Sequence, residues 1–113
     1  MTKVEAYIRP QKLEDVQAAL SDVGVHTMTV TEVRGAGKQR GFTHQYRGVE
    51  YTVNLIEKLK LEIFVPDYEA HEVAETIAES ARTGDLGDGK VFLIPVGDAI
   101  RIRTGEEGEI AVI

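Results

Sequence analysis

The feature that most constrains the fold is a strand–proline–helix order that occurs twice along the chain. Apolar side chains alternate with other residues across 3–9 and again across 58–65, and a proline follows each run, Pro10 or Pro66. Alternation with a period of two is typical of a β-strand that buries one face. Proline interrupts the hydrogen bonding of a strand and is well suited to the first turn of a helix. Each proline therefore predicts a transition from strand to helix.

Helical periodicity follows both prolines. The apolar residues at helical spacing are Leu13, Val16, Leu20 and Val23 in the first half, and Val73, Ala74, Ile77 and Ala81 in the second. Gly24 and Gly84 come after these runs, where glycine commonly ends a helix. Residues 25–33 are rich in valine and threonine and predict a second strand. The nearly continuous apolar run 91–96 predicts a buried strand.

The predicted order is strand–helix–strand, a long loop, and strand–helix–strand again. This is the double split βαβ arrangement of a ferredoxin-like sandwich. The expected fold is α+β, with a four-stranded antiparallel sheet, two helices and a long loop between strands 2 and 3. Two helices cover one face of such a sheet, so Tyr7, Thr29, Glu62 and Phe64 would lie on the open face. We expect one domain over residues 1–113 that associates into a homo-oligomer.

Composition narrows the class of protein. The chain has 113 residues, of which 42 % are hydrophobic and 28 % are charged, as in a folded soluble domain. No apolar run approaches the roughly 18 residues that a transmembrane helix needs, and the start lacks a signal-peptide core. Because cysteine is absent, the cytoplasm is the expected compartment. The net charge of -6 disfavours a general nucleic-acid binder.

The loop between the second and third predicted strands is unusually long. Residues 35–51 show neither strand nor helix periodicity, and they include four glycines and three basic residues. Structureless loops longer than about 12–15 residues are usually functional or disordered. From Arg34 to Lys60 there are six basic residues and two acidic ones, which indicates a site for a small anion. A solvated basic surface is the alternative.

Residues 84–90 match the first seven positions of a P-loop. Val91 stands where a P-loop has the Ser or Thr that holds magnesium, and the segment leads from helix to strand instead of from strand to helix. We therefore reject a P-loop. Closely spaced glycines and Lys90 would still bind phosphate through backbone N–H groups and positive charge. A helix end followed by a simple turn is the alternative.

A second candidate for phosphate recognition is Arg101-Ile102-Arg103, predicted as a short extended segment. Residues i and i+2 of an extended chain share a face, so both guanidinium groups would point the same way. Paired guanidinium groups suit bidentate recognition of phosphate. The acidic residues at 106, 107 and 109 would neutralise them in the alternative interpretation, a surface charge pair.

Several segments together resemble the PII nitrogen-regulatory signal-transduction proteins, from residue 1 to about Gly108 without a gap. The resemblance rests on the motifs Thr27-Met28-Thr29-Val30-Thr31-Glu32-Val33 with Gly35 and Gly37, Tyr46-Arg47-Gly48 with Glu50-Tyr51, Ala81-Arg82-Thr83-Gly84, Gly87-Asp88-Gly89-Lys90, and Arg101-Ile102-Arg103-Thr104-Gly105-Glu106. It implies a compact ferredoxin-like homotrimer with a nucleotide site in each cleft between subunits. ATP and ADP would compete there, and 2-oxoglutarate would bind beside Mg-ATP.

The resemblance also assigns ligand residues. Those for the nucleotide are Thr29, Gly37, Lys38, Glu62, Phe64, Gly87, Asp88, Gly89, Lys90, Arg101 and Arg103. Among them, Thr29, Glu62 and Phe64 would border the adenine, while the glycines, lysines and arginines would hold the phosphates. Those for 2-oxoglutarate are Gln39, Gly41 and Lys58, with Gln39 also as the Mg²⁺ ligand.

The resemblance implies a non-enzymatic sensor. Its loop, about residues 37–55, would retract with Mg-ATP and 2-oxoglutarate and extend with ADP to reach a partner. Implied partners are an ammonium transporter channel, which Arg47 would enter, and nitrogen-metabolism enzymes such as glutamine synthetase. The protein would be cytoplasmic and would reach the inner face of the membrane only through the transporter. Tyr51 is a possible modification site, and the C-terminal segment covers about residues 99–113.

This chain departs from the family pattern at three positions. Lys38 stands where arginine is common, Phe42 is unusual in the loop, and Val49 replaces a serine that one branch phosphorylates. Two other classes remain as alternatives, a small nucleotide- or phosphate-handling enzyme and an RNA-binding module on the same fold. Aromatic content of 6 % and the acidic charge disfavour the RNA-binding module, which stacks bases on exposed aromatic residues. No motif for a catalytic nucleophile supports the enzyme.

Overall fold

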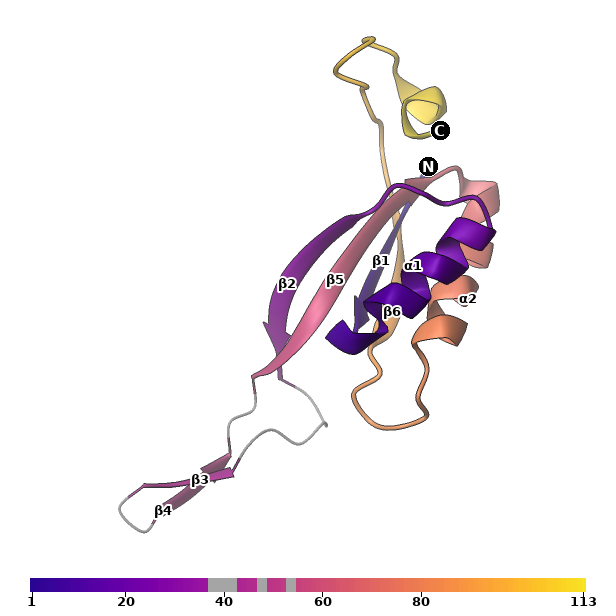
Figure 1. Cartoon of the computed structure of the whole chain (residues 1–113). Coiled ribbons are helices and arrows are strands. Elements are labelled where there is room, and N and C mark those ends of the chain that lie inside the picture. The colour runs from indigo at the N-terminus through magenta and orange to yellow at the C-terminus, as the bar shows by residue number, and fades with distance from the viewer. Residues whose placement is uncertain (37–42, 47–48, 53–54) are drawn as a thin grey trace.

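The computed structural model describes residues 1–36, 43–46, 49–52 and 55–113. A four-stranded antiparallel sheet has the order β2-β5-β1-β6, and both α-helices lie on one side of it (Figure 1). The elements are β1 (Thr2–Ile8), η1 (Pro10–Lys12), α1 (Leu13–Asp22), β2 (Thr29–Gly35), β3 (Thr43–Tyr46), β4 (Val49–Thr52), β5 (Ile56–Val65), α2 (Asp67–Ala81), β6 (Lys90–Pro95) and η2 (Gly108–Val112). The predicted ferredoxin-like α+β fold is confirmed.

The two central strands bury alternate side chains under the helices. Val4, Ala6 and Ile8 of β1 are at most 1 % exposed, and they pack with alternate residues of β5 and the inward stripes of both helices. The intervening residues of β1 and β5 lie on the open face. The period-two patterns at 3–9 and 58–65 therefore predicted correctly which side chains enter the core.

The first helix ends as the glycine after it predicts. Gly24 has φ +87°, its N–H bonds the Ser21 carbonyl at 3.0 Å, and the Val25 N–H bonds the Leu20 carbonyl at 2.9 Å. This is a Schellman-type helix end, and it leaves Val25 packed against the core. The strand that the sequence predicted over 25–33 is therefore shifted, and β2 begins at Thr29.

Three other expectations need correction. The long loop contains a two-stranded hairpin, β3 with β4, so the prediction that these residues lack regular structure was wrong. The strand predicted as buried is an edge strand, because β6 pairs only with β1 among the described strands, and Phe92 and Leu93 are each 45 % exposed. The extended segment predicted around Arg101 is a turn at residues 102–104, closed by the Gly105 N–H on the Arg101 carbonyl at 2.7 Å.

Candidate functional site

The turn between α2 and β6, here called the glycine–lysine loop (residues 84–90), is organised by one carboxylate. Asp88 accepts hydrogen bonds from the backbone N–H groups of Thr83 and Gly84, both at 2.8 Å, and from the Thr83 hydroxyl. Arg9 donates a further bond from Nε at 3.1 Å. These donors, the Thr83 groups foremost, hold the pKa of the Asp88 carboxyl well below its usual range. The side chain of Asp88 therefore faces the loop's own backbone.

Gly89 lies against the backbone of β1. Its φ is +99°, and a Cβ atom at this position would stand 1.7 Å from the carbonyl oxygen of Tyr7. Only glycine lets the chain pass this close in this conformation. The close approach brings Lys90 into register with Tyr7 at the start of β6. The predicted phosphate residues Gly89 and Lys90 are thus fixed on the sheet.

Lys58 reaches the same loop from β5. Its Nζ donates a hydrogen bond to the carbonyl oxygen of Gly87. Partial burial lowers the pKa of Lys58, the nearby Arg9 cation lowers it further, and Asp88 acts in the opposite direction. The structure therefore joins Lys58, which the sequence placed at the return of the long loop, to the glycines predicted to hold phosphate.

An open cavity of about 640 Å³ lies where these parts meet. Its walls come from Tyr7 on β1, the ends of β2 and β5 with Lys58, residues 85–90, and Phe92 on β6. Of the predicted ligand residues that the structure describes, five line it, namely Lys58, Gly87, Asp88, Gly89 and Lys90. Glycine backbone and two lysines around one cavity are suited to an anionic ligand.

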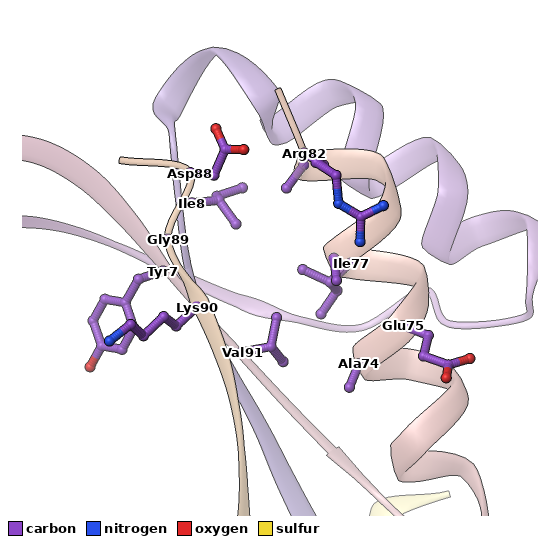
Figure 2. A pocket seen from close by; sticks show the side chains of 12 residues that line it. Tyr7, Ile8, Ala74, Glu75, Ile77, Arg82, Asp88, Gly89, Lys90 and Val91 are labelled. Atoms are coloured by element: carbon purple, nitrogen blue, oxygen red, sulfur yellow. The ribbon is translucent and has the colours of Figure 1, made fainter. Parts of the chain in front are cut away.

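A second cavity lies between α2 and β6 (Figure 2). It is lined by small and apolar side chains of α2 and by Ile8 and Val91, with Arg82 directed toward it (Figure 2). Gly89 and Lys90 line both cavities, so the end of the glycine–lysine loop forms a wall that they share.

The predicted adenine residues gather elsewhere on the open face. Thr29 stands opposite Glu62 in the β2–β5 register, and Phe64 is 45 % exposed two residues further on. Glu62 bonds Lys3 at 3.2 Å within a charged cluster that also includes Glu5. Along β5, Glu62 is about 13 Å from Lys58, a distance that one nucleotide spans.

Arg101 and Arg103 do not join this site within one chain. Lys90 begins β6 and Pro95 ends it, so about 17 Å of strand separates the glycine–lysine loop from the segment that carries the arginines. Arg101 bonds Glu106 at 2.7 Å and the carbonyls of Ile110 and Ile113 at 2.7 and 2.9 Å. The shared extended face predicted for the two arginines is wrong, because a turn follows Arg101 directly.

Other predicted residues cannot be placed in the same way. Gly37, Lys38, Gln39, Gly41 and Arg47 lie outside the described residues. Tyr51 lies in β4, where its backbone pairs opposite His44. Within the described ranges, no group of three or more His, Cys, Asp or Glu side chains is placed to hold a metal ion. None of the described helices is long and apolar enough to cross a membrane.

Two residues that hold the loop were missed from the sequence. Arg9 bonds both Asp88 and the Leu86 carbonyl, and Thr83 bonds Asp88 through its backbone and its hydroxyl. Arg9 gave no local signal, because it only continues the alternation of the first strand. Thr83 stands in one of the motifs that carry the family resemblance, yet no ligand role was assigned to it.

Known proteins match this chain over nearly its whole length. The family model described as Nitrogen regulatory protein P-II covers residues 1–106. The protein named Nitrogen regulatory protein P-II from Haemophilus influenzae is 54% identical over 112 residues, covering 99% of this chain and 100% of that protein. Nitrogen regulatory protein P-II 2 of Methanothermobacter thermautotrophicus is 54% identical, covering 99% of this chain and 97% of that protein. Nitrogen regulatory protein P-II 1 of Escherichia coli (strain K12) is 51% identical, covering 99% of this chain and 100% of that protein. The chain therefore belongs to the PII family of nitrogen regulatory proteins, which are signalling regulators that bind small effector ligands and act on targets of nitrogen metabolism.

Proposed function

We propose that this protein senses ATP, ADP and 2-oxoglutarate and passes the result to a partner through residues 37–55. The observation that carries the proposal is the meeting of Lys58 with the glycine–lysine loop at one open cavity. A lysine on β5 and a glycine loop before β6 are joined there, although they are far apart in the sequence. This arrangement supports two anion sites side by side, one for phosphates and one for a carboxylate.

The phosphates would bind along residues 87–90. The positive φ values of Gly87 and Gly89 bring backbone N–H groups close together in a turn, and Lys90 adds a point charge. Asp88 would contribute by holding the loop, since its carboxylate already accepts bonds from Thr83, Gly84 and Arg9. The adenine would extend along the open face toward Thr29, Glu62 and Phe64.

The site would be completed by a second copy of the chain. Arg101 and Arg103 follow β6, about 17 Å of strand away from the loop that begins it. In a homotrimer with cyclic symmetry the interfaces are head-to-tail, so two different surfaces of neighbouring subunits meet. The arginines of one subunit would then bind the phosphates held by the next. The exposed side chains of β6 and of the open face support burial in such an assembly.

2-Oxoglutarate would bind through Lys58, with Gln39 and Gly41 from the loop base. Gln39 would also hold Mg²⁺, which would supply positive charge beside the nucleotide and the keto acid. A ligand shifts a loop only as far as it binds one loop state better than the other. ADP lacks the γ-phosphate of Mg-ATP, so residues 37–41 would not gather around the ligand. The loop would then extend in the ADP state and reach its target.

The partners would be an ammonium transporter, entered by Arg47, or a nitrogen-assimilation enzyme such as glutamine synthetase. The protein would act without catalysis, in the cytoplasm and at the inner face of the membrane when bound to a transporter. Tyr51 would be a site for covalent modification. Lys38 retains the positive charge expected at its position but lacks the planar fork of arginine.

Calorimetric titration tests the proposal. 2-Oxoglutarate should bind when Mg-ATP is present and should fail to bind with ADP or without nucleotide. Lys58→Met should abolish this binding, whereas ADP should still bind, more weakly because the bond from Lys58 to the Gly87 carbonyl is lost. Lys60→Met is the matched control, because Lys60 lies on the same face of β5 beside Glu62 at 3.9 Å. Equal binding of 2-oxoglutarate with and without Mg-ATP would contradict the proposal.

A further inference from the structure

Arg9 holds the glycine–lysine loop at two points on either side of Gly87. The residue follows β1, and its guanidinium reaches across to a segment nearly 80 positions later in the chain. Nε donates to the Asp88 carboxylate at 3.1 Å, and a terminal nitrogen donates to the Leu86 carbonyl at 2.8 Å. The side chain of Arg9 is only 14% exposed, so it is packed into this position.

The bond to the Leu86 carbonyl fixes the direction of a neighbouring N–H group. A trans peptide is planar, and its C=O and the following N–H point in opposite directions. Because the Leu86 carbonyl is turned toward Arg9, the Gly87 N–H points away from the guanidinium. Lys58 does the same for the next peptide, since its bond to the Gly87 carbonyl turns the Asp88 N–H away from Lys58.

The loop needs such a restraint because its glycines are conformationally free. Gly84, Gly87 and Gly89 all have positive φ, and glycine loses more backbone freedom on ordering than any other residue. Fixing the backbone of each such residue costs conformational entropy. A loop that is already fixed before the ligand arrives avoids this cost at the moment of binding.

Arg9 does this without forming part of the cavity wall. The cavity of about 640 Å³ is lined by Gly87, Asp88 and Lys58, whereas Arg9 is not among the described residues that line it. Its effect on a ligand there would therefore pass through the loop. We propose that Arg9 is a positioning residue that presets the Gly87 peptide for phosphate binding, an inference that rests on the nucleotide site proposed above.

Calorimetry with ADP and three variants tests this role. Arg9→Gln removes the charge and the guanidinium, and Arg9→Lys keeps the charge but lacks the planar fork whose two separate nitrogens bond Leu86 and Asp88. We expect both to weaken ADP binding about 10-fold or more, the value of a lost charge-assisted bond. Lys12→Gln is the matched control, because it removes a positive charge three residues away that forms a surface pair with Asp15 at 3.6 Å. We expect it to bind ADP within about two-fold of wild type.

Backbone ¹⁵N relaxation of the ligand-free protein separates positioning from long-range charge. The Gly87 amide should have an order parameter near 0.85 in the wild type and below about 0.6 in Arg9→Gln. Arg9→Lys provides the comparison if Arg9→Gln does not fold. The inference would be overturned if both Arg9 variants bound ADP as tightly as the wild type. It would also be overturned if ADP binding weakened while the Gly87 amide stayed rigid. Failure of the wild type to bind ADP would instead overturn the proposed nucleotide site.

Discussion

Gly89→Ala is the substitution whose effect on stability follows most directly from the structure. The added Cβ would stand 1.7 Å from the Tyr7 carbonyl oxygen and 2.7 Å from the Tyr7 carbonyl carbon. Tyr7 cannot move aside, because it pairs with Lys60 in β5 and with Lys90 in β6. The glycine–lysine loop would therefore have to shift away from β1.

The size of the effect has two parts. A residue with a Cβ in the left-handed region costs roughly 1–2 kcal/mol. Moving a packed segment to relieve overpacking costs typically about 1–3 kcal/mol more. The free energy of unfolding should thus fall by about 2–5 kcal/mol, out of the roughly 5–15 kcal/mol of a native domain.

Urea denaturation at a fixed protein concentration measures this loss. With a slope of about 1–3 kcal/mol per molar urea, the midpoint should fall by on the order of 1–3 M. Gly84→Ala is the matched control, because Gly84 has φ +92° but a Cβ there would meet nothing within 4 Å. It should lose only the conformational part, about 1–2 kcal/mol. Equal losses in the two variants would refute the steric explanation.

Three further predictions concern the core, the loop carboxylate and the C-terminal segment. Ile77→Ala in α2, at a fully buried position, should lower the free energy of unfolding by about 2–5 kcal/mol, whereas Tyr68→Ala on the exposed side of the same helix should change it by about 0.5 kcal/mol or less, both measured in urea. The pKa of Asp88 is lower in the folded state, so the carboxylate stabilises the fold above its ordinary pKa of 3.8 and loses this effect as the pH falls through the lower folded value. The difference in melting temperature between wild type and Asp88→Asn should therefore shrink below pH 3.8. A difference that grows there would contradict the assignment. Arg101→Ala should speed amide hydrogen exchange across η2, because Arg101 bonds the Ile110 and Ile113 carbonyls, and Arg103→Ala should leave it unchanged.

The local sequence pattern correctly predicted the central strands, their buried faces and the end of the first helix. The alternation before Pro10 and before Pro66 identified the two central strands and their buried faces, and Gly24 marked the end of α1. Residues 91–96 were assigned to a buried strand because their apolar run does not alternate. Whether a strand lies at the centre or at the edge depends on which strands flank it, and the run itself carries no information about that.

In the candidate site, too, single segments could be predicted from the sequence, whereas the contacts between them could not. Lys58 and the glycine–lysine loop were each recognisable, yet their contact depends on how β5 and β6 flank β1. Arg9 was missed because its two bonds cross the fold, while its position in the sequence reads only as the end of a strand. Arg101 was expected on an extended segment, but Gly105, at φ +74°, takes part in a turn there.

Mixing two inactive variants tests most directly whether the nucleotide site is shared between copies of the chain. Lys90→Ala and Arg101→Ala should each lose ADP binding when assembled alone. In a trimer assembled at random from equal amounts of both, a cleft is intact where the Lys90 of one subunit meets the Arg101 of its neighbour, so about a quarter of the wild-type capacity should return. Calorimetry on the mixture would show this recovery. If the mixture bound no ADP, or if either variant alone bound it as the wild type does, the shared site would be contradicted.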